Sequence, residues 1–190
     1  MKQSEISPKE AETNLIHVLQ NAHAGEQAAA NAYWGHATSI FVSAEEKQEI
    51  LKILDEELHH RQRIREMLDE LNAGPRTARE WMMFSIGATI AFLCWFGGWF
   101  VPMYGAGKLE STNIEEYEVA ARLAHQAGHS HLVPELLEFG EVEWDHEKYF
   151  FEKCEGHWMN RLFPAWQRPG ERSGIQDRFS QWKSVAESKQ

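Results

Sequence analysis

The spacing of hydrophobic and polar positions predicts a chain built almost entirely from long α-helices. Apolar residues recur every three or four positions through most of the sequence, and no segment alternates as a half-buried strand does. A first helix is expected to begin at Ser7-Pro8, because serine can cap a helix and proline fits its first turn, and to end near Phe41. Ser43 is expected to cap a second helix that ends at Gly74-Pro75.

The second half of the chain continues the helical pattern. A third helix is expected from about Thr77 to Ala127, with a kink near Pro102. A fourth helix is expected from about His131 to His157, and WMNRLFPAW predicts a short helix after it.

These elements predict an all-α, ferritin-like four-helix bundle with a long apolar third helix and a short C-terminal helix. The bundle is expected to occupy residues 1–166 and to be followed by a polar tail over residues 167–190, in which Phe179 and Trp182 are the main apolar positions.

The apolar part of the third predicted helix raises the question of a membrane. Residues 81–104 form 24 consecutive positions without a charge, which is long enough for a bilayer crossing. The alternatives are a core helix of the bundle, or a packed helix with one flank at a membrane surface. The glycines, the proline and the large aromatic residues in the segment favour these two alternatives.

Composition narrows the class of protein further. The 190 residues, 43% hydrophobic and 25% charged, are typical of one globular domain. A formal net charge of -10 without a basic patch argues against a nucleic-acid partner. Cys94 and Cys154 lack metal-like spacing and favour a reducing compartment, and the polar N-terminus does not read as a signal peptide, so a cytoplasmic location is expected.

Acidic and histidine residues occur where helical spacing predicts a buried face. Glu26 lies in the middle of an apolar stripe on the first predicted helix. The second and fourth predicted helices each carry Glu-x-x-His, and residues three apart share a helix face, so the two side chains can bind one metal ion. Buried carboxylates without a counter-charge are costly, which predicts cations between them. One Glu from each of two helices with Glu-x-x-His from the other two is the ligand pattern of di-iron bundles.

In the second helix two overlapping pairs compete, Glu56/His59 and Glu57/His60. The apolar stripe of this helix passes through Glu57 and near His60, whereas the other pair points away from it. Glu57 also lies about as far as Glu26 from the predicted turn between the two helices, as an antiparallel hairpin requires. The sequence therefore favours Glu57 and His60.

In the third helix Glu110 shares a face with apolar residues and is the preferred ligand, with Glu116 as the next alternative and Glu115 as the third. The fourth helix places Glu143 and His146 on its apolar stripe. The predicted ligand set is Glu26, Glu57, His60, Glu110, Glu143 and His146. Four carboxylates with two imidazoles suit two iron ions best, with manganese as an alternative.

Other polar residues are assigned to supporting roles. Tyr33 and Tyr117 are expected in the core near the site, within hydrogen-bond reach of the ligands. The remaining histidines are expected at the surface or around the ligands, namely His17, His23, His36, His125, His129, His131 and His157.

The segment HAGEQAAANAYWG resembles the first-helix motif of the demethoxyubiquinone hydroxylases, di-iron proteins of ubiquinone biosynthesis. The matching positions are His23, Ala24, Gly25, Glu26, Tyr33 and Gly35. The Glu-x-x-His of the family's second helix falls on Glu57 and His60 when Pro75 is matched to the proline that follows that helix.

The likeness continues through the later helices. Lys108-Leu109-Glu110-Ser111 stands where the family has Val-Glu-Glu-Ser, and Tyr117 matches a tyrosine two turns further on. Glu143 and His146 match the ligands of the family's fourth helix. The resemblance spans about residues 15–157.

The chain departs from the family at two positions near these motifs. Val142 replaces a second acid before the fourth-helix glutamate, and Glu116 replaces a histidine. The resemblance nevertheless implies a ferritin-like fold and the hydroxylation of a prenylated benzoquinol by O2, with electrons from NADH or from the quinol. Tyr117 is then the candidate catalytic side chain.

The predicted ligands also limit how the chain meets a membrane. Glu26, Glu57 and His60 precede the apolar segment, and Glu143 and His146 follow it, so a complete crossing would separate ligands of one centre. The expected protein is therefore peripheral, at the inner face of the cell membrane. The oligomeric state is open, with a homo-oligomer as one alternative. The rival functions are an iron-oxidising or peroxide-reducing ferritin-like or rubrerythrin-like protein without an organic substrate, and a membrane-anchored interaction protein without metal.

Overall fold

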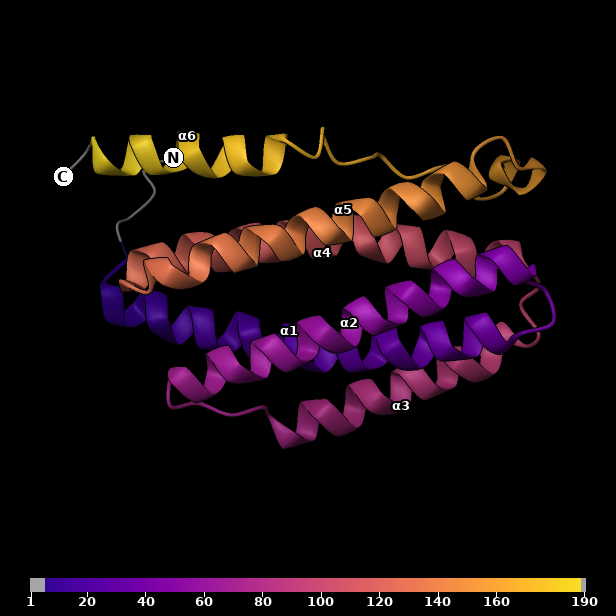
Figure 1. Cartoon of the computed structure of the whole chain (residues 1–190), viewed down its shortest axis with the longest axis horizontal. Helices are drawn as coiled ribbons and strands as arrows, with labels where there is room; N and C mark the ends of the chain where they lie inside the picture. Colours follow the sequence, from indigo (N-terminus) through magenta and orange to yellow (C-terminus); the bar gives the residue numbers. More distant parts are fainter. Residues whose placement is uncertain (1–5, 189–190) are drawn as a thin grey trace.

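The computed structural model describes residues 6–188, and within that range the chain is all-helical without a strand, as the periodicity predicted. Two long hairpins, α1–α2 and α4–α5, form a bundle, with α3 along one side and the C-terminal segment along the other (Figure 1). The elements are α1 (Pro8–Thr38), α2 (Ala44–Glu70), α3 (Thr77–Cys94), α4 (Phe100–Ala127), the 3-10 turn η1 (Ser130–Leu132), α5 (Val133–Cys154), the 3-10 turn η2 (Trp158–Arg161) and α6 (Gly174–Glu187).

Side-chain caps start the first two helices where the sequence predicted them. The Ser7 hydroxyl accepts a hydrogen bond from the Glu10 amide at 3.2 Å. At α2 the Ser43 hydroxyl accepts from the Glu46 amide, and the Glu46 carboxylate accepts from the Ser43 amide at 2.8 Å, which forms a capping box. Both helices end a few residues before the predicted stops, and Asn72, with a φ of 53°, turns the chain after α2.

The prediction of one kinked third helix from Thr77 to Ala127 was wrong. The helix breaks between α3 and α4, where Gly98 adopts a backbone φ of 71°. Residues other than glycine rarely adopt this angle. Pro102 lies in the first turn of α4, where its missing amide proton breaks no helical hydrogen bond. The proline therefore starts a new helix and does not kink an existing one.

The C-terminal region also differs from the expectation. WMNRLFPAW contains the 3-10 turn η2 and not a short α-helix. The segment expected as a polar tail contains α6, which buries Ile175 and Phe179 against the bundle. Only a narrow apolar stripe on α6 faces inward, and this stripe was too short to stand out among the polar residues around it.

Small residues let α3 approach α1 closely. A Cβ atom on Gly87 would lie 2.6 Å from the Ala28 carbonyl oxygen, and one on Gly35 would lie 2.3 Å from the Ala91 Cα. α3 packs along α1 but makes few contacts with α4, although the two helices are consecutive. This leaves a gap between α3 and α4 that is bounded by α1.

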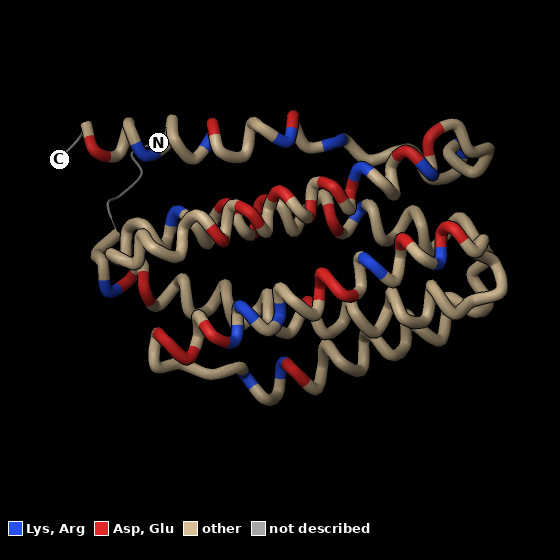
Figure 2. The backbone as a smooth tube through the Cα atoms, in the orientation of Figure 1, with Lys and Arg blue, Asp and Glu red and all other residues tan. Residues whose placement is uncertain are grey.

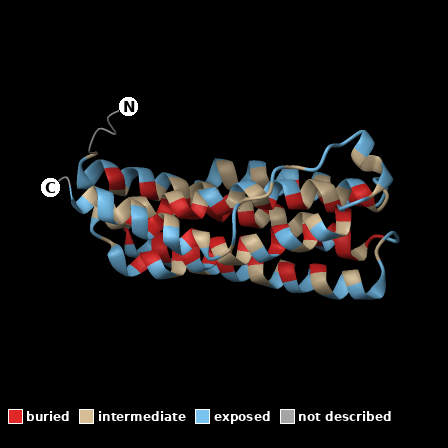
Figure 3. Ribbon diagram, turned by 90° about the horizontal axis from the view of Figure 1, so that it is seen from above, coloured by how far each residue is buried: buried red, intermediate tan, exposed pale blue. Residues whose placement is uncertain are grey.

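Buried residues gather where the helices face one another (Figure 3). Two apolar clusters fill the bundle, one around Leu19, Leu68 and Leu136, the other around Ile53 and Phe150. A band of buried acids and histidines lies among them. Beyond its first turn α3 carries no charge (Figure 2). No helix within residues 6–188 combines the length and apolar content that a bilayer crossing requires.

Candidate metal centre

The structure brings the six predicted ligand residues together in the middle of the bundle, and all six are buried. Their oxygen and nitrogen atoms form two groups in which potential ligand atoms lie within 4.8 Å of one another. The first group is Glu57, Glu110, Glu143 and His146, and the second is Glu26, His60 and Glu143. Because Glu143 belongs to both groups, the two groups are adjacent, and Glu143 could contribute a ligand atom to a cation in either group.

Helix register explains why these residues meet. Glu57 and His60 on α2, like Glu143 and His146 on α5, are three residues apart and face the interior together. Of the alternatives considered from sequence, His59 and Glu115 are exposed, and Glu56 and Glu116 are partly buried and belong to neither group of potential ligands. The choice made from the apolar stripes therefore agrees with the observed geometry.

The two histidines turn the same ring nitrogen toward the carboxylates. His60 Nδ1 lies 3.1 Å from Glu143 Oε1, and His146 Nδ1 lies 3.2 Å from Glu57 Oε1. On its other side, His146 Nε2 donates to Glu56 Oε2 at 2.9 Å. In the neutral tautomer that this bond sets, Nδ1 carries a lone pair that faces the cluster, as a metal ligand requires.

Tyrosines and an asparagine support the carboxylates. The Tyr117 hydroxyl donates a hydrogen bond to Glu26, and the Tyr33 hydroxyl donates one to Glu110. Asn113 Nδ2 donates to Glu110 Oε2 at 2.9 Å. The prediction that both tyrosines lie in the core beside the ligands is confirmed, and their hydrogen bonds fix the direction of two carboxylates from α1 and α4.

Three atoms of the cluster are buried and make no well-aligned hydrogen bond within residues 6–188, although two of them, His146 Nδ1 and Glu57 Oε1, lie 3.2 Å apart. They are both carboxylate oxygens of Glu57 and Nδ1 of His146. Unpaired buried polar groups are rare because each costs about 1–3 kcal/mol. These atoms converge on the first group of potential ligands, so a cation held there would satisfy all three.

The electrostatics of the centre lead to the same conclusion. Burial raises the pKa of Glu57 and Glu110 well above the usual value, and the neighbouring carboxylates, Glu143 among them, raise it further. Burial also raises the pKa of Glu26. Within the described range, the hydrogen bonds and ion pairs of the four acids involve no Lys or Arg. Two divalent cations would balance four ionised carboxylates, and two neutral imidazoles would complete the set.

Glu143 behaves differently from the other acids. Burial alone would raise its pKa, but the close imidazoles of His146 and His60 stabilise the ionised carboxylate, outweigh burial and hold the pKa well below the usual value. Burial likewise opposes the charged form of His146, yet its pKa lies well above the usual value because Glu143 and Glu56 stabilise the imidazolium. Without a cation, therefore, protons take the place of positive charge in the centre.

Sequence reasoning missed two supporting residues. Glu56 was set aside as a ligand because it points away from the stripe, and that direction lets it orient His146 from outside. Asn113 lies three residues after Glu110, on the same helix face, and contacts both Glu110 and Glu143. A search for hydrogen-bonding residues three or four positions from each ligand would have found Asn113.

A second network ties three helices together beside the centre. His23 Nδ1 on α1 lies 2.8 Å from Glu80 Oε1 on α3, and Arg61 Nη2 on α2 donates to Glu80 Oε2 at 2.7 Å. His23 and Arg61 each lie close in sequence to a ligand. The network fixes the beginning of α3 against α1 and α2, as expected of a supporting histidine.

A cavity of about 780 Å³ reaches the centre through the gap between α3 and α4. Glu26, Glu110, Tyr33 and Tyr117 line its inner end. Most of its other walls are apolar and include Met83, Ile86, Ile90, Leu93, Val101, Ala106 and Leu109. Because Ile86, Leu93 and Leu109 are also exposed, the cavity opens sideways onto the apolar face of the molecule.

A third group of potential ligands lies at the surface and includes none of the residues that line this cavity. Glu70, His129 and His131 offer atoms within 4.8 Å of one another, but all three are at least partly exposed. Exposed acid–histidine pairs form without metal, and Glu12 already accepts a hydrogen bond from His129 at 3.1 Å. His129 and His131 thus lie at the surface, as predicted.

In comparisons with known proteins, no family model, curated protein or solved structure matches this chain. The likeness to the demethoxyubiquinone hydroxylases is therefore carried only by the motif residues named above.

Proposed function

We propose that this protein is a ferritin-like, di-iron monooxygenase that uses O2 to hydroxylate a prenylated benzoquinol. The observation that carries the proposal is the junction of two features: a buried four-carboxylate, two-histidine cluster and a large apolar cavity that ends on it. The cluster suits two oxygen-preferring cations, and the cavity suits a hydrophobic organic substrate.

Six residues would hold the iron pair. Glu57, Glu110, Glu143 and His146 would hold one ion, and Glu26, His60 and Glu143 would hold the other. When bound, the pair would supply the reaction of O2 with the ring, in which one oxygen atom enters the product and the other leaves as water, with two electrons from NADH or the quinol. Manganese is the alternative metal for the same ligand set.

The chain's own groups would orient the ring and exclude water. Burial raises the pKa of Tyr117 and Tyr33 well above the usual value, so both phenols keep their protons and donate hydrogen bonds to Glu26 and Glu110, respectively. The ring would lie at the inner end of the cavity beside these four side chains. Its prenyl tail would leave between α3 and α4, along side chains that are mostly apolar.

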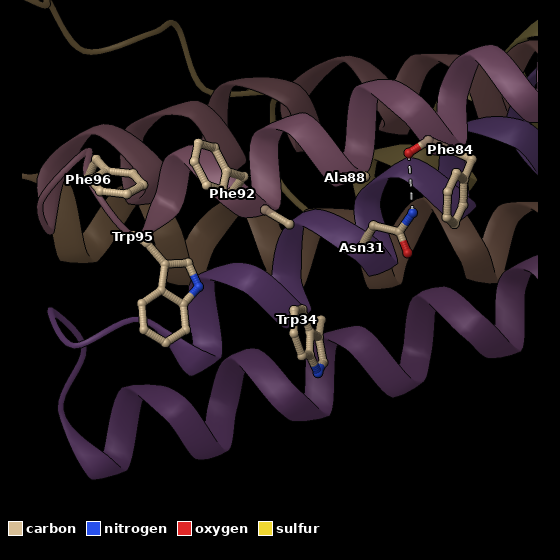
Figure 4. Close-up of a pocket in the computed structure, with 8 residues that line it drawn as sticks. Asn31, Trp34, Phe84, Ala88, Phe92, Trp95 and Phe96 are labelled. Atoms are coloured by element: carbon tan, nitrogen blue, oxygen red, sulfur yellow. Dashed lines mark hydrogen bonds between the residues drawn. The ribbon is translucent and has the colours of Figure 1, made fainter.

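An apolar surface lies where such a tail would leave the protein. Trp81, Phe92, Phe96 and Leu109 each expose 60% or more of their surface. Phe92 and Phe96 line a groove of about 530 Å³, together with Trp34 from α1 and further aromatic side chains of α3 and the turn after it (Figure 4). Exposed aromatic residues on a helix without charge beyond its first turn are typical of proteins that touch the membrane interface, which favours peripheral binding of a bilayer.

The rival is an iron-oxidising or peroxide-reducing protein of the ferritin-like or rubrerythrin-like kind, which would use the same ligands. Small inorganic substrates do not require a cavity with apolar walls of this size. The cavity therefore favours the hydroxylase over this rival.

The test is iron loading followed by turnover. Protein loaded with Fe(II) without oxygen is expected to hold about two irons per chain, and on exposure to ¹⁸O2 to convert a demethoxy-benzoquinol with a short prenyl tail into a product carrying one ¹⁸O. Glu57→Gln should lose both properties, whereas Glu49→Gln, which changes a partly exposed acid on the same helix, should keep them.

Iron binding without labelled product, together with reduction of hydrogen peroxide, would favour the rival. Failure to bind iron at all would exclude both.

A further inference from the structure

The polar side chains in the cavity wall are not equally free to bind a ligand. Five of them are already hydrogen-bonded to one another at the centre, namely Glu26, Tyr33, Glu110, Asn113 and Tyr117. His36, expected at the surface or around the ligands, is 2% exposed, and its unpaired Nε2 atom is buried and so closed to the cavity. Glu116 on α4 is the acid of the wall that the proposed centre leaves unused.

The Glu116 carboxylate has no partner of its own. Within residues 6–188 it forms no hydrogen bond, and its pKa reflects only burial and the charges around it. Its oxygen atoms are not fully buried, in contrast to both carboxylate oxygens of Glu57. A partly desolvated carboxylate that stays open can accept a hydrogen bond from a donor that enters the cavity.

Helix geometry places Glu116 on the cavity side of α4. It follows Leu109 by seven positions and Gly105 by eleven, and both spacings return to nearly the same face of an α-helix. Leu109, Gly105 and Glu116 all line the cavity. The Glu116 side chain therefore extends the same wall of the cavity toward the level of the metal centre.

The cavity is open beside the centre at this level. Tyr117, the next residue after Glu116, donates its hydroxyl proton in a hydrogen bond to Glu26 on α1. Gly25, which precedes Glu26, also lines the cavity, and a Cβ atom added to it would meet nothing within 4 Å. Gly25 and Glu116 thus flank the Tyr117–Glu26 hydrogen bond, with room between the two helices for a flat ring.

The charges around Glu116 show that it lies near the centre and not at the outer surface. Burial raises its pKa, and the charges of Glu26 and Glu143 raise it further. The charge of Arg79 on α3 acts in the opposite direction and favours the carboxylate. Cations that neutralise Glu26 and Glu143 would remove the repulsion and leave the effect of Arg79.

We propose that Glu116 selects the reduced form of the substrate, by accepting a hydrogen bond from a ring hydroxyl of the quinol held beside Tyr117. This inference rests on the proposed function, because it assumes that the ring lies at the inner end of the cavity. It names Glu116 as the residue that distinguishes a quinol from the quinone of the same shape.

The two oxidation states differ in the hydrogen bonds that they offer. A quinol carries two hydroxyl groups that can donate, whereas a quinone carries two carbonyl oxygens that only accept. A carboxylate also only accepts, so a quinone carbonyl beside Glu116 would leave both groups without a donor in an environment with little water. Glu116 therefore favours the form that reacts with O2.

The test compares a demethoxy-benzoquinol with a short prenyl tail and the corresponding quinone. Both are added without O2 to protein loaded with Mn(II), which neither oxidises the quinol nor reduces the quinone. Dissociation constants are measured by quenching of tryptophan fluorescence. The quinol is expected to bind about tenfold more tightly than the quinone, the range of one hydrogen bond to a charged group.

Variants at two neighbouring positions locate the effect. Glu116→Gln keeps the shape of the side chain but can donate as well as accept, so it should bind the quinone more tightly and reduce the preference to about twofold or less. Glu115→Gln, which changes an exposed acid one position away on the same helix, should keep the wild-type preference. Both variants should retain manganese, because neither residue belongs to a group of potential ligands.

Equal binding of the two forms by the wild-type protein, or tighter binding of the quinone, would overturn the role of Glu116 and leave the proposed hydroxylase intact. A preference that persists unchanged in Glu116→Gln would also overturn it. A purely structural role would weaken the binding of both forms equally in Glu116→Gln, which contradicts the inference. Binding of neither form would count against the quinol hydroxylase itself and would remove the inference with it.

Discussion

Two sets of buried glutamates lie in this bundle, and they are neutralised in opposite ways. Glu147 on α5 is 0% exposed and accepts hydrogen bonds from Arg168 at 2.9 Å and from Trp166 at 2.8 Å. Glu118 on α4 is paired with Arg178 and Arg122. Glu57 and its neighbours at the centre are buried as deeply but have no arginine or lysine among their partners in the described chain.

The difference separates structural acids from candidate functional ones. Glu147 and Glu118, the outer acids, lie outside the centre. They receive positive charge from the C-terminal segment, which carries Arg168 and Arg178 across α5 and α4. The central acids receive only phenol, amide and imidazole contacts. Burial alone is therefore a weak indicator of a metal site, and burial without a cationic side chain is a strong one.

The largest expected effect comes from exchanging one acid of each set on the same helix. Glu143→Gln should lower iron affinity by at least about 100-fold, because this residue belongs to both groups of potential ligands. Glu147→Gln, one turn away and equally buried, should keep the iron and lose only stability. Iron content after dialysis measures the first effect, and equal retention of iron in the two variants would refute the distinction.

The pH dependence of the metal-free protein gives the next largest effect. Glu57 and Glu110 have a raised pKa in the folded state. Their protonated forms therefore contribute stability that is fully present below about pH 4.5, the usual pKa of the unfolded chain, and that is lost as the pH rises through the folded pKa. His146, also raised, adds to the loss above about 6.5. Glu143, with a lowered pKa, acts in the opposite sense below about 4.5.

Urea unfolding of the metal-free protein should therefore show a free energy that falls from about pH 5 to about pH 8, by about 1.4 kcal/mol per pH unit for each proton released. The Glu57→Gln/Glu110→Gln variant should show a flatter profile. With iron bound the slope should reverse, because the cations require ionised ligands. A flat profile in the metal-free wild type would contradict the account of the central acids.

A smaller effect is expected when an outer acid loses its partner. Arg168→Met should lower the free energy of unfolding by about 2 kcal/mol. This loss is smaller than that expected on breaking a fully buried ion pair, because Arg168 is partly exposed and Trp166 still donates a hydrogen bond to Glu147. Adding Glu147→Met should recover most of this loss, since no uncompensated charge remains. Iron binding should be unchanged in both, and a loss of iron would show that the two sets are coupled.

The smallest effect is expected at the tyrosine beside Glu26. Tyr117→Phe should retain both irons and lower the turnover of the quinol by about tenfold, because it removes one hydrogen bond that orients a ligand. Tyr104→Phe, which removes a hydroxyl bonded to the Pro164 carbonyl on the outer face of α4, is the matched control. Equal turnover in the two variants would remove Tyr117 from the proposed mechanism.

Much of the fold could be predicted because its signals are local. The caps at Ser7 and Ser43 depend on side chains within three residues, and the apolar stripes define which face of each helix is buried. The same stripes selected Glu57 over Glu56 and Glu110 over Glu115. The break at Gly98 could not be recognised with equal ease, because a proline near a glycine pair fits both a kink and a helix start.

The sequence by itself determined the all-helical class, the helix faces and the set of acids and histidines that would meet, because each depends on spacing along one helix. Only the tertiary structure decided which partner each buried acid receives, where the cavity opens and which nitrogen of His36 is left unpaired. These properties depend on distances between helices that are far apart in the chain. Side chains such as Arg168 and Glu147 meet only when the whole bundle has packed.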